Sequence, residues 1–230
     1  MSMPSPFMYM SPEQVMKDRA DYARRNIGRG KPIVALEYDN GVLLLAENPS
    51  AMLHKVSEIY DRIAFAGVGK YDEYERLRIL GIRQADLKGF AYSREDVTAR
   101  TLANLYSQVL GQIFTDSLKP FEVEILIAGV SDDGDPAELY HVTFDGVVMD
   151  EQHFAAVGGE TGALSEFLSE RYEPTPTIDA ALRLGVEALR SVGNNDLGPA
   201  QLEAAVLDRA LPRRKFRRLS AQELETALGS

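Results

Sequence analysis

Residues 33–47 read IVALEYDNGVLLLAE, two apolar runs joined by a short polar turn. The runs Ile33–Tyr38 and Val42–Glu47 have the length and the apolar content of buried β-strands. Asp39-Asn40-Gly41 between them is a turn signal, because Asn and Gly accept the positive φ that tight hairpins often require. The stretch therefore predicts a buried β-hairpin, and the rest of the chain is organised around it.

A helix is predicted directly before the hairpin, because residues 11–14 read SPEQ. Ser11 is placed to cap the first turn, and Pro12 suits the first helical position. Gln14 lies three residues after the cap, where the second half of a capping box is found. Residues at helical spacing follow until Gly28, which ends the helix.

Beyond the hairpin, the hydrophobic pattern alternates between groups of short strands and pairs of helices. It predicts strands at Arg62–Val68, Glu122–Val130, Leu139–Phe144, Val147–Met149, Phe154–Val157, Glu203–Asp208 and Lys215–Leu219, and helices at Tyr71–Ala85, Ser93–Thr115, Gly159–Arg171, Thr177–Val192 and Ser220–Leu228. Ser93, with Asp96 three residues later, is expected to cap its helix. Stacked sheets with helices outside bury these apolar faces, which predicts an α+β fold: a four-layer α-β-β-α sandwich with an extra N-terminal helix, in a single domain over residues 11–230.

Composition narrows the function classes. The 230 residues are 45% hydrophobic and 26% charged, which excludes wholesale disorder. The absence of cysteine excludes disulfides, thiolate metal sites and a cysteine nucleophile. Three histidines argue against a histidine-rich metal site, although carboxylate sites for magnesium or calcium stay open, so we expect no metal and no cofactor. Without a membrane-spanning run or a signal peptide's basic start, the chain is expected to be soluble and cytoplasmic.

The formal charge of −10 argues against a nucleic-acid binder, which needs basic surface to displace counterions. One basic segment, residues 212–218, reads PRRKFRR and departs from this balance. Because Phe216 and Leu219 supply apolar anchors and the rest of the chain is acidic, we favour a strand edge that meets acidic surface over a nucleic-acid tail.

An ordered set of short motifs runs through nearly the whole chain: Ser11-Pro12-Glu13-Gln14, Asp21-Tyr22-Ala23-Arg24, Gly41–Glu47, His54-Lys55-Val56, Phe114-Thr115, Lys119-Pro120-Phe121, Ala128-Gly129, Phe144-Asp145-Gly146 and Val157-Gly158-Gly159. With this set the chain resembles the proteasome family, in particular α-type subunits of actinobacterial 20S core particles. The resemblance implies the sandwich fold of the N-terminal-nucleophile hydrolases, seven-membered rings and a gating role.

Hydrolases of this superfamily use the side-chain oxygen of a first residue as nucleophile and its free amino group as base. In the resembling family the nucleophile opens the hairpin, but here that position, counted back from Glu47, holds Lys31 followed by a proline. The first threonine of the sequence is Thr98, and residues 27–48 contain no serine. Glu47 and Lys55 keep the acid and the approximate place of the catalytic lysine. We therefore predict no catalytic residue in this chain and place the nucleophile of a threonine-type endopeptidase complex on a partner β subunit.

The resemblance also implies a pocket between adjacent α subunits that binds the C-terminal carboxylate of an activator, typically an ATPase ring. Lys55 matches the lysine that pairs with this carboxylate, because a carboxylate leaving water needs a fixed cation. Gly69 matches the glycine that lets the tail approach the backbone, and Arg24 is a third candidate. Without the resemblance, Lys55 is a solvated lysine at the end of a strand.

Two further regions carry expectations about substrate entry. Residues 1–10 are uncharged and broken by proline, which predicts a flexible gate arm. Its proposed gate residues are Met3, Pro4, Phe7, Met8 and Tyr9, together with Pro12 at a reverse turn, and the proposed pore-constriction residues are Phe114, Asp116, Lys119 and Phe121. Because Met3-Pro4-Ser5 replaces the Tyr-Asp-Arg triplet of archaeal and eukaryotic relatives, the contacts of that triplet are not carried over. The alternative for the arm is a frayed terminus without a task.

The hypothesis from the sequence is thus a structural and gating α subunit of an α7β7β7α7 particle that supports protein degradation. Its expected partners are β subunits, other α subunits, the C-terminal tails of an ATPase ring activator and unfolded protein substrates, with neither nucleic acid nor membrane. The predicted helix Ser93–Thr115 is expected to supply part of the contact to the β ring. The alternatives are a self-processing N-terminal-nucleophile amidohydrolase or β-type threonine peptidase, and an oligomeric binding protein without a peptidase partner.

Overall fold

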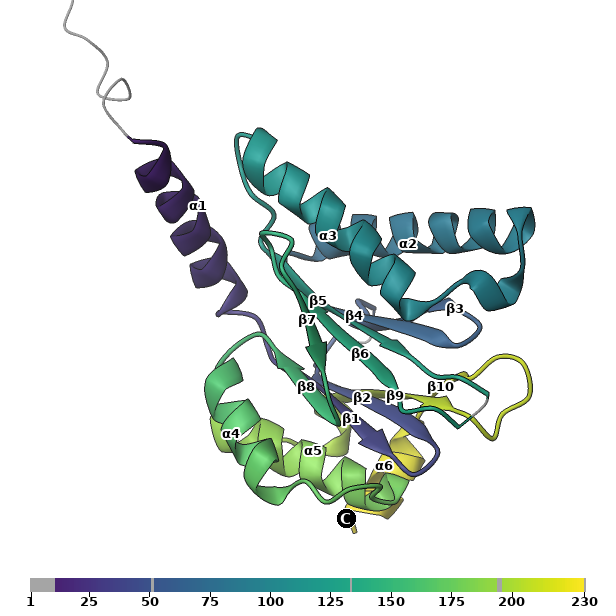
Figure 1. Cartoon of the computed structure of the whole chain (residues 1–230). Coiled ribbons are helices and arrows are strands. Elements are labelled where there is room, and N and C mark those ends of the chain that lie inside the picture. The colour runs from purple at the N-terminus through teal and green to yellow at the C-terminus, as the bar shows by residue number, and fades with distance from the viewer. Residues whose placement is uncertain (1–10, 51, 133, 194–195, 230) are drawn as a thin grey trace, which may run out of the picture.

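The computed structural model describes residues 11–50, 52–132, 134–193 and 196–229. In these residues two five-stranded sheets stack on each other, and helices cover both outer faces (Figure 1). The helices are α1 (Pro12–Ile27), α2 (Tyr71–Ala91), α3 (Ala99–Asp116), α4 (Thr161–Arg171), α5 (Ile178–Val192) and α6 (Ala221–Leu228). The predicted α+β sandwich with an extra N-terminal helix is confirmed. None of the helices in this part of the chain has the length and apolar character that crossing a membrane demands.

Neighbouring strands are antiparallel in both sheets. The first sheet has the order β10 (Phe216–Arg218), β9 (Leu202–Asp208), β2 (Gly41–Glu47), β1 (Ile33–Tyr38) and β8 (Phe154–Val157). The second has the order β3 (Val56–Tyr60), β4 (Ile63–Gly69), β5 (Val123–Gly129), β6 (Glu138–Val142) and β7 (Val148–Glu151). The predicted hairpin is therefore the pair β1–β2, at the centre of the first sheet.

Gly41 is required in this hairpin, and its φ of +159° agrees with the prediction for the glycine. Asn40 keeps a negative φ, so the turn does not depend on a left-handed asparagine. Tyr38 pairs with Gly41, which leaves two residues in the loop. A Cβ on Gly41 would lie 1.8 Å from the carbonyl oxygen of Leu207 on β9, so only glycine lets β9 pass this close.

Apolar side chains fill three layers. Ala35 of the first sheet and Leu126 of the second belong to the core between the sheets. Leu182 of α5 packs with the outer face of the first sheet, on the side of α4 and α6 (Figure 1). On the opposite side, Tyr106 of α3 packs against Phe65 of β4 with ring centroids 5.9 Å apart. Full burial of one such large side chain contributes about 1.5–3 kcal/mol to folding, so these layers fix how the sheets and helices lie together.

One strand was missed and one predicted boundary is wrong, because the outer residues of these elements face solvent. The strand β3 was not predicted, because as an edge strand it buries only Val56 and Ile59 and shows no regular alternation. The helix α2 continues to Ala91 instead of ending at Ala85. Its last turns expose Leu87 and Phe90, so no apolar stripe marks them in the sequence.

Two predicted caps also differ from the structure. Ser93 caps a short 3-10 turn at Arg94–Asp96 rather than a long helix. The helix α3 starts after Thr98, whose hydroxyl accepts the N–H of Thr101. At α1, Ser11 accepts the N–H of Gln14 as expected, but the Gln14 side chain donates to Asp18 instead of returning to the cap. Each competing polar group lies within four residues, where the sequence pattern cannot choose between them.

The basic segment at residues 213–218 forms ion pairs within the chain. Its partners are Glu58 for Arg214, Asp132 for Lys215, Glu223 for Arg217 and Glu203 for Arg218. These acidic groups come from several elements around β10. The interpretation as a strand edge that meets acidic surface is thus confirmed.

Candidate functional site

The position that holds the nucleophile in a catalytic relative of this fold is occupied by an ion pair. Lys31 lies two residues before the start of β1, and its Nζ lies 2.8 Å from Oε1 of Glu47, the last residue of β2. The Glu47 carboxylate is buried, whereas the Lys31 side chain is half exposed. A protonated amine has no free electron pair with which to attack a carbonyl. The ion pair therefore joins the segment before β1 to the end of β2.

Lys55 lies next to this ion pair, immediately before β3. Its Nζ donates to the carbonyl oxygen of Lys31 at 2.7 Å, and its own carbonyl accepts the N–H of Gly67 at 3.0 Å. Burial lowers the pKa of Lys55 to about 8, an effect opposed by the charges of Glu47 and Glu203 and increased by Lys31. At neutral pH the ammonium is therefore mostly charged and held in one place, as a binding site for a carboxylate requires.

Gly69 is the last residue of β4 and lies close to Gly30, the residue before Lys31. Its φ is +105°, and a Cβ there would lie 1.9 Å from the carbonyl oxygen of Glu122, so the position accepts only glycine. A Cβ on Gly30 would lie 3.4 Å from the amide nitrogen of Gly69. Gly69 therefore lies next to Gly30, and Lys55 binds the following residue, Lys31. The structure thus brings Gly69 and Lys55 to the same segment, Gly30–Lys31.

Arg24, the third predicted pocket residue, has other partners. Its guanidinium lies 3.8 Å from Asp21 and 5.5 Å above the ring of Phe144. Arg24 belongs to α1, and in the described part of the chain neither of these two contacts connects it to Lys55. The side chain is 63% exposed, so a role in a pocket shared by neighbouring subunits stays a prediction.

The predicted pore segment is not uniformly exposed. Phe114 packs on Phe144 with ring centroids 5.7 Å apart, and Phe121 is half-buried against the core beneath α2 and α3. Asp116 is exposed at the end of α3. The residue that projects fully into solvent is Leu118, which the sequence reasoning missed. An apolar residue within the polar turn that follows a helix is the signal that could have found it.

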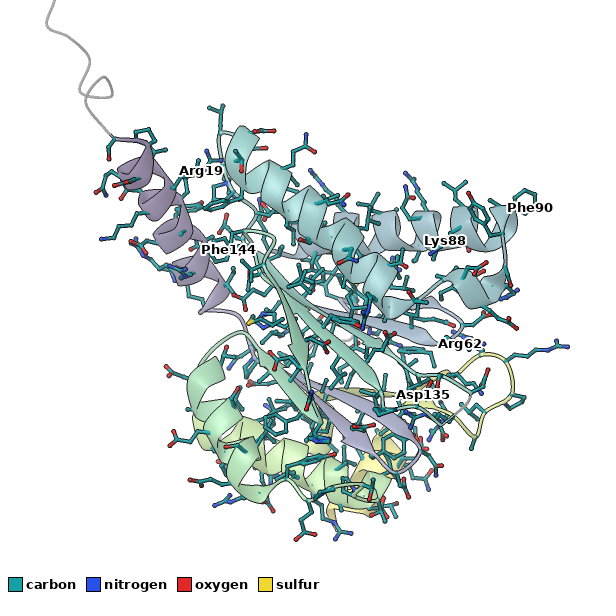
Figure 2. The ribbon with its side chains drawn as sticks, in the orientation of Figure 1. Arg19, Arg62, Lys88, Phe90, Asp135 and Phe144 are labelled. Carbon is teal, nitrogen blue, oxygen red and sulfur yellow. The ribbon has the colours of Figure 1, made fainter. Side chains whose placement is uncertain are left out.

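One buried carboxylate, that of Glu73 on α2, holds the pore segment from one side. Its Oε1 accepts from Lys119 Nζ at 2.7 Å, and its Oε2 accepts the N–H of Glu122 at 2.6 Å. From the other side, Tyr22 on α1 donates to the Glu122 carboxylate at 3.2 Å, and Arg19 donates to the carbonyl of residue 117 (Figure 2). The segment is therefore clamped between α1 and α2, a connection that no sequence motif indicates.

The gate residues fall on both sides of the boundary of the described structure. Pro12 is the first residue of α1, directly after the cap formed by Ser11. Met3, Pro4, Phe7, Met8 and Tyr9 lie outside the described residues, so the proposed gate arm stays a prediction.

Exposed apolar side chains gather at the C-terminal end of α2. Phe90 at the end of α2 is 93% exposed and points outward, with Leu87 and Tyr92 also exposed nearby (Figure 2). Beside them, a hollow of about 400 Å³ between the two helices is lined mainly by aliphatic side-chain atoms, including those of Leu102 and Leu105. An exposed apolar surface of this kind is typical of a contact with another protein.

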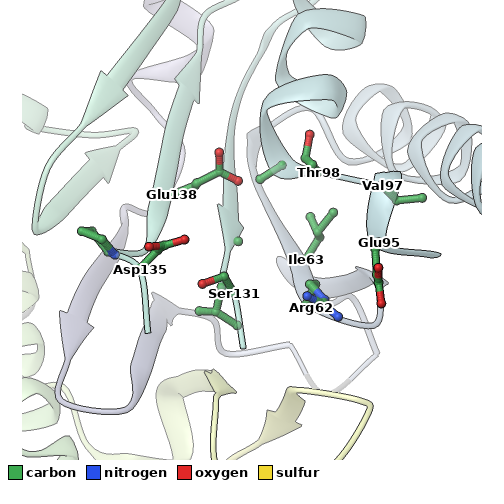
Figure 3. A pocket seen from close by; sticks show the side chains of 12 residues that line it. Arg62, Ile63, Glu95, Val97, Thr98, Ser131, Asp135 and Glu138 are labelled. Carbon is green, nitrogen blue, oxygen red and sulfur yellow. The ribbon is translucent and has the colours of Figure 1, made fainter. Parts of the chain in front are cut away.

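A second hollow, of about 320 Å³, lies where the turns of the second sheet meet the segment before α3 (Figure 3). Its polar lining includes Arg62, Thr98, Asp135 and Glu138. Arg62 pairs with Asp132 at 3.0 Å. In the described part of the chain, no three His, Asp or Glu side chains gather closely enough to hold a metal ion.

The sequence was compared with protein-family models and with known proteins, and both comparisons match most of the chain. A family model described as "Proteasome subunit" matches residues 27–207. The protein named "Proteasome subunit alpha" of Streptosporangium roseum is 54% identical over 226 residues, which cover 98% of this chain and 87% of that protein. Proteins of the same name from Thermomonospora curvata and Acidimicrobium ferrooxidans are 51% and 49% identical, with 98% and 97% of their own lengths covered. The chain therefore belongs to the proteasome subunit family.

Proposed function

We propose that this chain is the non-catalytic α subunit of a 20S proteasome core, which forms seven-membered outer rings on partner β rings. The Lys31–Glu47 ion pair carries the proposal, because it fills the place where a catalytic subunit presents its hydroxyl nucleophile. The relatives named "Proteasome subunit alpha", at about half identical residues over nearly the whole chain, support the same assignment.

Peptide hydrolysis by the isolated and the co-expressed chain tests this proposal. The purified chain is expected to show no hydrolysis of a fluorogenic peptide and to keep all residues from Met1 or Ser2 in its intact mass. Co-expressed with a β subunit from the same genome, it should give a four-ring particle in negative-stain images and hydrolysis that a threonine-directed covalent inhibitor stops. Cleavage by the isolated chain, or a mature chain starting at an internal Ser or Thr, would establish the self-processing alternative instead. Failure to form any particle with β would favour the oligomeric binding protein.

The proposed entry path combines the arm of residues 1–10 with the clamped segment before β5. Seven copies of Leu118, each fully exposed at the tip of this segment, would form an apolar collar on the ring axis. The ion pairs of Lys119 with Glu73 and Glu122 would hold each collar residue in place. The uncharged arms would close the opening above the collar.

Deleting Ser2–Tyr9 is expected to raise hydrolysis of a short peptide by the assembled particle several-fold, because an apolar plug no longer covers the entrance. The matched control replaces the same residues by a Gly/Ser segment of equal length, which keeps the chain's bulk but removes its apolar side chains. Equal rates in all three particles, at equal particle mass, would count against a gate formed by the arm.

The proposed pocket for an activator tail lies at Lys55 and Gly69. The ammonium of Lys55 would bind the C-terminal carboxylate, and the tail would pass Gly69, the position that the resemblance matches to the glycine of this pocket. The apolar surface at Phe90, Leu87 and Tyr92 is the proposed contact with the β ring, to which α3 contributes the other wall of the hollow.

A further inference from the structure

Lys55 ends the connection between β2 and β3, and this connection is fastened to one carboxylate on a distant strand. Glu203 lies near the start of β9, 148 positions after Lys55, and its side chain is only 9% exposed. A buried carboxylate is stable only where hydrogen-bond donors surround it. The donors around Glu203 therefore indicate which segments its carboxylate holds together.

Both carboxylate oxygens of Glu203 are occupied. Oε2 accepts from Asn48 Nδ2 at 2.7 Å and from the backbone N–H of Lys55 at 2.8 Å. Oε1 accepts the backbone N–H of Val56 at 3.2 Å and a guanidinium N–H of Arg218 at 2.6 Å. His54 Nδ1 also lies 3.3 Å from Oε1.

These contacts fix the backbone at the point where the Lys55 side chain leaves it. The strand β3 pairs only with β4, so the N–H of Val56 on its other edge has no sheet partner and turns to Glu203. The side chain of Asn48 donates to Glu203 and also, at 2.7 Å, to the carbonyl oxygen of Leu53. It therefore links the start of the connection to its end. With two consecutive amides held by one carboxylate, the Lys55 ammonium is directed to the carbonyl of Lys31.

We propose that Glu203 is the positioning residue for Lys55, and that it presets the ammonium for the carboxylate of an activator tail. The inference rests on the proposed function of Lys55. The charge of Glu203 also acts against the effect of burial on the pKa of Lys55, so it helps to keep the ammonium protonated. Arg218 pairs with the same carboxylate at 2.6 Å, which reduces its repulsion of an incoming carboxylate.

Glu203→Gln tests the proposal with little change in size. An amide supplies one acceptor oxygen and one NH₂ donor, so at least one of the donors around the carboxylate faces another donor. The probe is a synthetic peptide that copies the C-terminus of the host's own ring ATPase, with a free carboxylate or amidated as the control. We expect the concentration for half-maximal stimulation of the co-expressed particle to rise about tenfold or more, as loss of charge-assisted bonds implies, while basal hydrolysis stays unchanged.

A second readout separates positioning from a merely structural role. Without the charge of Glu203, the pH above which stimulation is lost should fall, because the pKa of Lys55 decreases further. The other charged groups around Lys55, namely Lys31 and Glu47, and around Glu203, namely His54 and Arg218, are unchanged in this variant. The matched control is Glu58→Gln on β3, which removes a carboxylate bound by Arg214 but not one that contacts the Lys55 backbone.

The outcomes distinguish this inference from the function on which it rests. If Lys55→Ala loses stimulation but Glu203→Gln keeps the wild-type half-maximal concentration and pH limit, Glu203 is not a positioning residue and the pocket stands. If Lys55→Ala itself has no effect, the pocket assignment fails. Should Glu203→Gln not assemble, Glu203→Asp keeps the charge but withdraws it by one methylene, and normal stimulation of that variant would overturn the inference.

Discussion

Replacing Lys55 by alanine is expected to abolish stimulation of peptide hydrolysis by an activator's C-terminal tail, while the particle assembles normally and keeps its basal rate. The ammonium is already partly desolvated and held 2.7 Å from the Lys31 carbonyl, so it binds a carboxylate without first being ordered. A charge-assisted bond of this kind contributes about 1.5–3 kcal/mol, or roughly a factor of 10 to 100 in affinity. Stimulation by the free-carboxylate peptide, compared with the amidated one, measures the loss.

The same residue gives the expected pH dependence. Burial lowers the pKa of Lys55 to about 8, so the ammonium is charged below that pH and neutral above it, and stimulation should decline as the pH rises through this range. A bound carboxylate favours the charged form and moves the decline in the complex upward. For folding, the unfolded chain binds more protons than the folded chain between about 8 and 10.5, so this lysine makes the fold more stable as pH rises through that window.

Lys17→Ala, which removes an exposed lysine on α1, is the control for Lys55→Ala and should behave like the wild type. Wild-type stimulation of Lys55→Ala would remove Lys55 from the pocket. A half-maximal peptide concentration that does not change between pH 7 and pH 9 would show that binding of the tail does not depend on this ammonium.

Phe90→Asp is expected to prevent the α ring from joining the β ring. Phe90 is 93% exposed on the outer side of α2, so the substitution should leave the fold of the chain intact. In the proposed interface, however, the new carboxylate would lose its water among Leu87, Tyr92 and the apolar hollow beside them, at a cost of several kcal/mol in each subunit. Native mass spectrometry of the co-expressed chains measures the outcome.

Leu118→Asp provides the matched control, because it places the same charge on another fully exposed apolar residue outside the α2–α3 surface. That variant should assemble and change only substrate entry. A complete four-ring particle with Phe90→Asp would exclude this surface as the contact with β, and a chain that no longer forms α rings would assign it to contacts between α subunits.

The fold could be predicted where buried residues follow one another in the sequence. The hairpin of residues 33–47 is buried on both faces, so its apolar runs mark both strands. The helix α1 was predicted from Ser11 and Pro12, which act within one turn. Prediction failed at β3 and at the end of α2, because those residues are partly exposed and their structure depends on the β4 strand and on α3. A local pattern of apolar residues predicts a strand or helix only where the buried positions recur with a constant spacing.

For the site, the order of residues determined what the chain lacks. A lysine and a proline stand where a hydroxyl nucleophile would open the hairpin, and no folding of the chain can change that. Lys55 and Gly69 were proposed as pocket residues from the sequence, through the resemblance of their neighbourhoods to a known family. The side chains and backbone groups that these two residues contact could not be predicted from the sequence.

Only the tertiary structure decided how these residues are held. Glu203 supports Lys55 from a strand 148 positions further along the chain, and Glu73 binds Lys119 across 46 positions. Such pairs form because sheet stacking and helix packing bring distant segments together, and the buried carboxylates then take the donors that they meet there. The exposure of Leu118 has the same origin, since the contacts of α1 and α2 with the predicted pore segment leave this apolar side chain in solvent. The sequence thus determined which residues stand at the end of the hairpin, and packing determined where their charges lie.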